Sequence, residues 1–338
     1  VERRLRTHLS ASAPADLADH CIRSQVVFPA AGFIALAMAA LHRAERPLTL
    51  AHLELDQPLR LASEPTELQL VLGADCIEFH SHASVEGPWR CHGQARVPQP
   101  STEPPLAPAV CPDGAEALPL APFYSALARF GLSYRPAFQP LKEVWRAGDQ
   151  AWARLQRPAG AGDWALLDGC FQVVAATLDP EAAAGQLFLP VGLEQIWWAR
   201  PELPDQLECQ VELVPSDEPA FVRAHLLLRA EGELIGWVRG FRLRRLPRQA
   251  LDWLFPLPAD QQPQAPRFPE HQRWLVQAQW QPCPEQPSHE RSVSPIDPVE
   301  APPADVELVW PKPDQPVDAA LAELLAIAQH NPKTCLLY

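Results

Sequence analysis

Paired cysteines are missing from this sequence of 338 residues, whose eight cysteines are scattered and form no CxxC pair. The disulfide framework of a small secreted domain has compact, regular cysteine spacing. Scattered single cysteines fit reduced thiols better, so we expect a cytoplasmic protein. The same lack of ligand pairs leaves a structural metal without its usual cysteine and histidine set, and we expect none.

Long apolar runs and a basic surface are missing as well. The longest apolar stretch, Val26–Leu41, is interrupted by Pro29 and Gly32, and it is shorter than the about 20 residues that span a bilayer. The charged residues 1–9 precede no apolar segment, so no secretory leader is expected. Lysine and arginine number 28 against 41 acidic residues, a net charge of −13. These features argue against a membrane span and against nucleic acid as the main partner.

Proline is abundant, with 40 residues, and hydrophobic residues make up 47% of the chain, enough for a substantial core. Two mostly apolar segments, Pro29–Leu41 and Trp164–Leu178, predict buried helices, because alanine and leucine favour helix interiors and proline fits a first turn. Strand-like runs accompany each helix, at 67–72, 76–83 and 89–97 in the first half and at 151–155, 206–214, 221–229 and 233–243 in the second.

One buried helix with a set of antiparallel strands, occurring twice, predicts an α+β double hot-dog fold, in which each sheet wraps around a central helix. The expected organisation is an N-terminal hot-dog at 1–98, a linker at 99–119, a C-terminal hot-dog at 120–247, a proline-rich linker at 248–305 and the truncated start of an α/β subdomain at 306–338.

Four short motifs occur in order along both halves. They are His20 to Pro29 with Ser24 between them, Gly131 to Phe138 with Tyr134 and Arg135, Asp168 to Gln172, and the apparent turn Leu189-Pro190-Val191. Their order and spacing resemble the dehydratase domains of polyketide and fatty-acid synthases, over about residues 5–245. The following region is similar to the ketoreductase-type structural region of a type I modular polyketide synthase. Taken singly, each residue has a common structural explanation, and only their joint order carries the resemblance.

The resemblance implies a hydro-lyase with His20 as base and Asp168 as acid. Gln172, Tyr134, Pro29, Ser24, Phe138 and Pro190 would position the substrate. The residue types suit this chemistry, because an imidazole accepts a proton near neutral pH and a buried carboxylic acid stays protonated and can donate one. Asp168 and Gln172 are four apart and share one helix face. Amides at the start of the helix near Pro29 would polarise the thioester carbonyl.

The implied reaction converts a (3R)-hydroxyacyl thioester to the α,β-unsaturated, usually trans, thioester during polyketide chain elongation. An acyl carrier protein would deliver the substrate on its phosphopantetheine arm, and no metal or nicotinamide cofactor would be needed. The other implied partners are neighbouring domains of the same multifunctional synthase and a second copy in a homodimer.

Two positions depart from the family pattern. Ser24 and Arg135 stand where the family has glycine, so we expect a restricted loop and a narrowed substrate path. The alternatives are a double-bond isomerase, a hot-dog thioesterase and an inactive scaffolding domain. Isomerase-like family members typically alter the positions that Asp168 and Pro29 occupy, and both residues are retained here.

Overall fold

The computed structural model describes most of the first 255 residues. The described ranges are 2–82, 87–99, 103–129, 131–178, 186–216, 218–247 and 250–255. The chain divides into two units, Val1–Gln261 and Gln262–Tyr338, and every described residue belongs to the first. The α/β subdomain expected at 306–338 and the linker beyond 255 therefore lie outside the described residues. Within the described ranges, no helix is long and apolar enough to cross a membrane.

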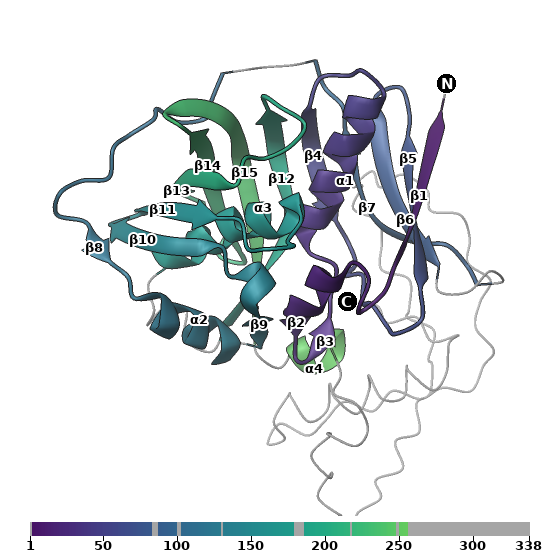
Figure 1. Ribbon diagram of the computed structural model, residues 1–338, viewed down its shortest axis with the longest axis horizontal. Helices are drawn as coiled ribbons and strands as arrows, with labels where there is room; N and C mark the ends of the chain where they lie inside the picture. The colour runs from purple at the N-terminus through teal and green to yellow at the C-terminus, as the bar shows by residue number, and fades with distance from the viewer. Residues whose placement is uncertain are drawn as a thin grey trace, which may run out of the picture. The chain divides into compact units, whose positions relative to one another are not determined.

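A continuous sheet of twelve strands, all paired antiparallel, runs through the described part of the chain (Figure 1). In spatial order its strands are β1 (Arg3–Leu9), β5 (Thr66–Leu72), β6 (Cys76–His82), β7 (Arg90–Arg96), β4 (Thr49–Leu55), β12 (Gln186–Trp198), β15 (Glu233–Pro247), β14 (Phe221–Ala230), β13 (Gln206–Val214), β11 (Gln150–Gln156), β10 (Leu141–Ala147) and β8 (Glu116–Ala117). The two halves join where β4 pairs with β12, placing Leu50 opposite Ile196. The fold is the expected double hot-dog.

Two apolar helices fill the two halves of the sheet. Helix α1 (Ala30–Arg43) buries residues on nearly every side, among them Phe33 and Met38. Helix α3 (Asp163–Gln172) continues as the 3-10 helix η3 (Val173–Thr177), and α1 and α3 pack against each other. Each large apolar side chain buried in this way contributes about 1.5–3 kcal/mol to folding. Both helices predicted from the sequence are confirmed, with ends shifted by one to six residues.

The expected turn at Pro190 is wrong, because Pro190 lies inside strand β12. The pairing of β12 with β15 shifts register between Pro190 and Gly192. A proline has no N–H to donate to a sheet, so strands accommodate it at such irregularities. The irregularity sits beside the cavity described below, which Pro190 lines.

A small three-stranded sheet connects the halves below the main sheet (Figure 1). It contains β3 (Gln25–Val26), β2 (His20–Ile22) and β9 (Leu132–Tyr134), and the 3-10 helix η1 (Ala15–Asp19) leads into β2. Helix α2 (Leu120–Arg129) precedes β9, and the 3-10 helix η2 (Pro136–Phe138) follows it. Because β9 pairs with β2, a segment of the second half lies directly beside His20.

A short helix lies at the start of the proline-rich linker expected at 248–305. Residues just beyond the last strand form helix α4 (Ala250–Leu254). Leu251 and Phe255 are 2% and 0% exposed and pack with Ile22, Val27 and Leu187. The polar residues after position 247 predicted a linker, but these two apolar side chains pack against the hot-dog domain.

A chain that ends at Gln249 should therefore be less stable than one that ends at Gln261. It loses two buried side chains, at about 1.5–3 kcal/mol each, or roughly 3–6 kcal/mol in total. Chemical denaturation of the two truncated proteins checks this expectation. Equal unfolding midpoints would show that the packing of Leu251 and Phe255 contributes nothing.

Candidate active site

His20 begins strand β2 and lies opposite Tyr134 of β9. Its Nδ1 atom lies 2.7 Å from the carbonyl oxygen of Val27. A carbonyl oxygen only accepts hydrogen bonds, so Nδ1 carries the hydrogen and donates it, and Nε2 of the neutral ring keeps a free lone pair. The ring also packs against Phe138, with the two centroids 5.0 Å apart. The local backbone thus orients His20 with Nε2 as a proton acceptor.

Asp168 lies in the middle of helix α3 and is 4% exposed. Its Oδ2 atom accepts a hydrogen bond of 2.9 Å from Nε2 of Gln172, one helical turn later. Burial raises the pKa of Asp168, while the nearby His20 and the hydrogen bond from Gln172 act in the opposite direction. A carboxyl group with a raised pKa keeps its proton at higher pH, which is what a proton donor needs.

The two groups face each other without bonding directly. His20 Nε2 and Asp168 Oδ1 are 4.0 Å apart, beyond hydrogen-bond distance, so each can contact a molecule between them. Both line a cavity of about 390 Å³, within the about 300–1,000 Å³ typical of small-molecule sites. Its other lining residues are mostly apolar and include Ile22, Val27, Phe28, Ala30, Phe33, Leu132, Tyr134, Phe188, Leu189, Pro190, Val191, Leu246, Leu254 and Phe255.

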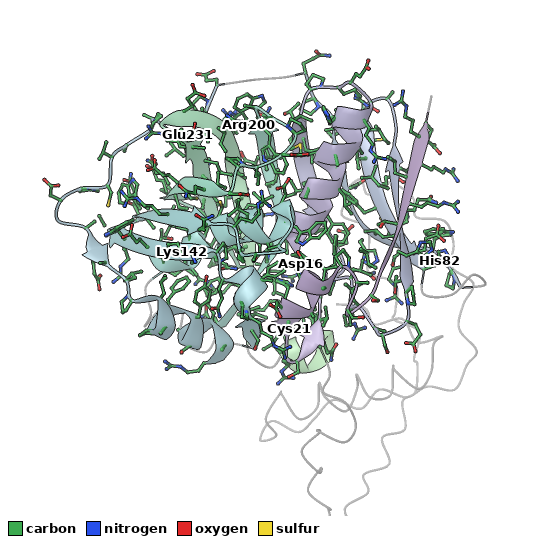
Figure 2. All side chains as sticks on the ribbon, viewed as in Figure 1. Asp16, Cys21, His82, Lys142, Arg200 and Glu231 are labelled. Carbon is green, nitrogen blue, oxygen red and sulfur yellow. The ribbon has the colours of Figure 1, made fainter. Side chains whose placement is uncertain are left out.

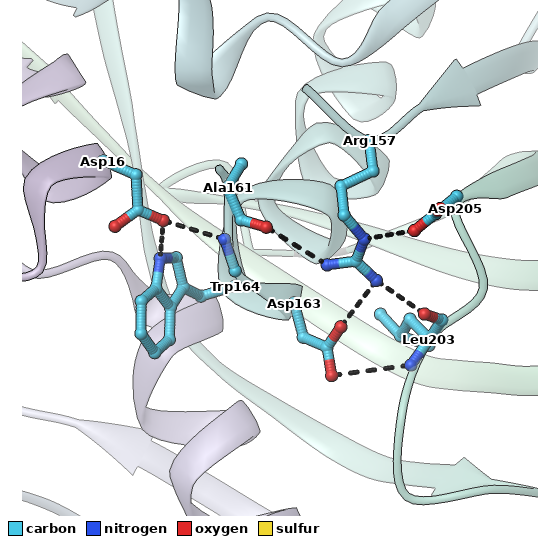
Figure 3. Close-up of polar contacts among 8 residues, drawn as sticks. Asp16, Arg157, Ala161, Asp163, Trp164, Leu203 and Asp205 are labelled. Atoms are coloured by element: carbon cyan, nitrogen blue, oxygen red, sulfur yellow. Dashed lines mark hydrogen bonds and ion pairs between the residues drawn. The ribbon is translucent and has the colours of Figure 1, made fainter. Parts of the chain in front are cut away.

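The beginning of α3 is tied to the first half of the fold by Asp16. Its Oδ2 atom accepts hydrogen bonds from the backbone N–H of Gly162, at 2.9 Å, and from the indole N–H of Trp164, at 2.7 Å (Figure 3). These contacts satisfy a free donor at the helix N-terminus and place a negative charge where the helix dipole favours one. The segment that leads into His20 therefore also anchors the helix that carries Asp168.

Further contacts fix the beginning of α3 and the helix η2. Arg157 forms ion pairs with Asp163 at 2.7 Å and with Asp205 at 2.8 Å, which brace the first turn of α3 against the sheet (Figure 3). Asp19 accepts a hydrogen bond of 2.8 Å from the N–H of Ala137 and so fixes η2. Figure 2 labels Asp16 and Cys21 in this part of the molecule, on η1 and on β2.

Comparison with known proteins identifies the fold and the family. The family model described as "Polyketide synthase dehydratase N-terminal domain" matches residues 102–252, and the model "Polyketide synthase dehydratase domain" matches residues 1–85. This chain belongs to the polyketide synthase dehydratase family.

Several relatives resemble this dehydratase domain. Mycoketide-CoA synthase of Mycobacterium tuberculosis is 34% identical over 166 residues, covering 47% of this chain and 4% of the synthase. The dehydratase domain from the CurJ module of curacin polyketide synthase is similar in structure, with a TM-score of 0.64, 20% identity, and coverage of 74% of this chain and 93% of that one. An inactive mutant of the CurK dehydratase, in which phenylalanine replaces a histidine, has a TM-score of 0.62, 19% identity, and 74% and 94% coverage.

The structure brings most of the predicted dehydratase residues together. Tyr134 and Pro190 line the cavity, Phe138 contacts the His20 ring, and Gln172 bonds Asp168. Pro29 is buried as the N-cap of α1, and its neighbours Phe28 and Ala30 reach the cavity.

The two departures from the family pattern lie away from this cavity. Ser24 is exposed at the β2–β3 turn, where both Arg23 and Ser24 have positive φ, 48° and 65°. Positive φ angles favour glycine at both positions of this turn. Serine at the second position therefore adopts its left-handed conformation at some cost in free energy. Arg135 is exposed and does not line the cavity. A substrate-positioning role for Ser24 and a path narrowed by Arg135 are therefore not supported.

Sequence reasoning missed several groups around the dehydratase cavity. Tyr124 of α2 hydrogen-bonds Gln172, and Phe188, Arg244 and Phe255 line the cavity. Arg244 and Phe255 lie outside all four motifs, and α2 carries no buried residue that would mark its inner face. Only tertiary contacts between elements far apart in the sequence bring these side chains to the cavity that His20 and Asp168 line.

Proposed function

We propose that this domain dehydrates a 3-hydroxyacyl thioester, with His20 as base and Asp168 as acid. One observation carries the proposal: a histidine with a free Nε2 and a buried carboxyl group with a raised pKa face each other across an apolar cavity. The CurK dehydratase in which phenylalanine replaces one histidine is an inactive mutant, and this supports an essential histidine here as well.

In the proposed reaction, Nε2 of His20 takes a proton from C2 of the acyl chain. The electron pair forms the C2=C3 double bond, the C3–O bond breaks, and the hydroxyl leaves as water with the proton of Asp168. The resulting imidazolium and carboxylate lie 4.0 Å apart, and return of the proton from His20 to Asp168 by way of the released water restores the starting state. The step transfers only protons and water, and we propose that it needs neither a metal nor a nicotinamide.

The thioester carbonyl would lie at the beginning of α1. Phe28, Ala30 and Phe33 line the cavity there, and the first backbone N–H groups of a helix have no partner within it. Such amides stabilise the negative charge that builds on the carbonyl oxygen as the C2 proton leaves.

The substrate is proposed to be a (3R)-hydroxyacyl chain on an acyl carrier protein, with a trans-unsaturated product. Arg244 is exposed and lines the cavity together with Leu246 and Ala250. A cation in this position suits the phosphate of a phosphopantetheine arm that enters with the substrate. Neighbouring synthase domains and a second copy of the chain are the further proposed partners.

Replacement of Arg244 by alanine should raise KM for a carrier-bound substrate about two- to fivefold, the size expected of an exposed ion pair. KM for an N-acetylcysteamine thioester, which has no phosphate, should stay unchanged. Arg229→Ala is the matched control, because Arg229 is an arginine bonded to Gly232 away from the cavity. A parallel rise for both substrates would contradict the role of Arg244.

The experiment that tests the function is mass measurement on a 3-hydroxyacyl carrier thioester incubated with the protein. Loss of one water is the result expected of a dehydratase. Release of the free acid would identify a thioesterase, and an unchanged mass would indicate a scaffolding domain. An isomerase would leave the mass of an unsaturated thioester unchanged and move its double bond.

A further inference from the structure

Tyr124 is joined to the acid by a chain of two hydrogen bonds. It lies on α2, and its hydroxyl donates to Oε1 of Gln172 at 3.2 Å. Nε2 of Gln172 then donates to Oδ2 of Asp168 at 2.9 Å. Burial raises the pKa of Tyr124, against a backbone hydrogen bond with Leu141, so its hydroxyl stays protonated and remains a donor. None of the four sequence motifs includes this tyrosine.

The amide of Gln172 has only one orientation that satisfies its neighbours. Its NH₂ group donates both hydrogens, one to Asp168 and one to the carbonyl oxygen of Phe138 at 3.0 Å. Its carbonyl oxygen accepts from Tyr124. If the amide turned over, its oxygen would face two acceptors and its NH₂ would face a donor. Tyr124 and Phe138 thus hold the amide from opposite ends.

The orientation of this amide decides which oxygen of Asp168 can carry the acid proton. Oδ2 already accepts an N–H from Gln172, and a proton placed on Oδ2 would compete with that hydrogen. The remaining oxygen, Oδ1, is the one that faces Nε2 of His20 across the cavity. A proton on Oδ1 points at the space in which the leaving hydroxyl would lie.

We infer that Tyr124 is a positioning residue that acts through Gln172 to keep the acid proton of Asp168 on Oδ1. This role rests on the proposed function and names a residue for it. Without the Tyr124 hydroxyl, Oε1 of Gln172 is left buried without a partner, and the amide is held from one end only. The N–H bond to Oδ2 then weakens, and the proton is shared between the two oxygens.

The Tyr124→Phe variant tests this role, because it removes one hydroxyl and keeps the ring. We expect kcat to fall about tenfold, the effect of one buried polar group left unpaired. The bond from Gln172 lowers the pKa of Asp168, so weakening it raises that pKa further. Dehydration needs protonated Asp168, and the alkaline limb of the pH–rate profile should therefore move to higher pH while the rate falls.

The other ionisable groups around Asp168 are unchanged in this variant. Those that influence its titration or line its cavity are His20, Asp56, Tyr134, Cys170 and Arg244. Thr177→Val is the matched control, since it removes a buried hydroxyl bond of 2.7 Å to Val174 without contact to Gln172. It should leave the pH profile in place. Gln172→Met should move the alkaline limb in the same direction as Tyr124→Phe, and the double variant should be no worse than Gln172→Met alone.

A measurement independent of turnover separates this inference from the proposed function. The carboxyl ¹³C signal of Asp168, identified by its absence in Asp168→Asn, reports the titration of that group directly. An upward shift in Tyr124→Phe supports the positioning role even if the wild-type protein fails to dehydrate, in which case only the proposed function falls. An Asp168 titration identical in wild type and Tyr124→Phe would overturn the role of Tyr124.

Discussion

Replacement of His20 by alanine is expected to lower kcat for dehydration by about 10²–10⁴-fold, the contribution typical of a general base. The physical reason is local: the Nδ1–H of His20 is bonded to Val27, so Nε2 is the only basic atom of the ring that faces the cavity. Rates on a 3-hydroxyacyl carrier thioester, followed by mass, give the measurement. Circular dichroism and thermal unfolding show whether the variant keeps its fold.

A second buried histidine supplies the control. His92 is 1% exposed, its Nδ1 bonds the carbonyl oxygen of Gln57 at 3.0 Å, and it does not line the cavity. His92→Ala should lower the free energy of unfolding by an amount similar to His20→Ala, but the folded variant should retain turnover. If His20→Ala turned over like wild type, His20 would not be the base.

Asp168→Asn is the second substitution with a large expected effect, again about 10²–10⁴-fold in kcat. Asparagine keeps the shape of the side chain and an oxygen for the bond from Gln172, but it has no acidic proton. Asp163→Asn, on the same helix and paired with Arg157 away from the cavity, is the matched control and should retain turnover. Near wild-type rates in Asp168→Asn would assign the acid to another group.

Asp168→Asn should lower kcat but raise the stability of the folded protein at higher pH. Burial raises the pKa of Asp168 above its unfolded value, so the folded protein binds this proton more tightly than the unfolded chain. The associated stabilisation is present below the unfolded pKa, about 3.9, and is lost as pH rises through the folded pKa. Asparagine does not titrate, so the variant should gain stability relative to wild type as pH rises. Urea unfolding across that pH range is the measurement.

The pH dependence of turnover follows from the same group. A rate that falls on the alkaline side, as Asp168 loses its proton, is expected for the wild-type protein, and this limb should disappear in the residual activity of Asp168→Asn. A limb that persisted in the variant would have to belong to a different ionisation.

The two helices and Asp168 could be predicted from the sequence because the patterns that indicate them lie within short segments of the chain. Mostly apolar segments rich in alanine and leucine marked α1 and α3, and Asp168 and Gln172 fall on one helix face because they are four residues apart. The ordered motifs pointed to His20 and Asp168 together through resemblance. The distance between them, 4.0 Å, depends on the pairing of β4 with β12 and of β2 with β9, which no local pattern encodes.

Two predictions from local sequence rules failed because contacts with distant parts of the chain determine the structure at those positions. Proline at position 190 signals a turn, yet a register shift against β15 lets it stay within β12. The polar and proline-rich chain after residue 247 signals a linker, yet Leu251 and Phe255 are covered by apolar residues from β2 and β12.

By itself, the sequence determined two apolar helices with antiparallel strands and the two residue types needed for proton transfer, since these depend on side-chain chemistry and short spacing. Only the tertiary structure decided that the Val27 carbonyl sets the tautomer of His20, that Asp16 anchors the helix of Asp168, and that Tyr124 reaches Gln172. Each is a hydrogen bond whose energy depends on distance and direction, and the partners of the last two come from separate elements that folding alone brings within reach.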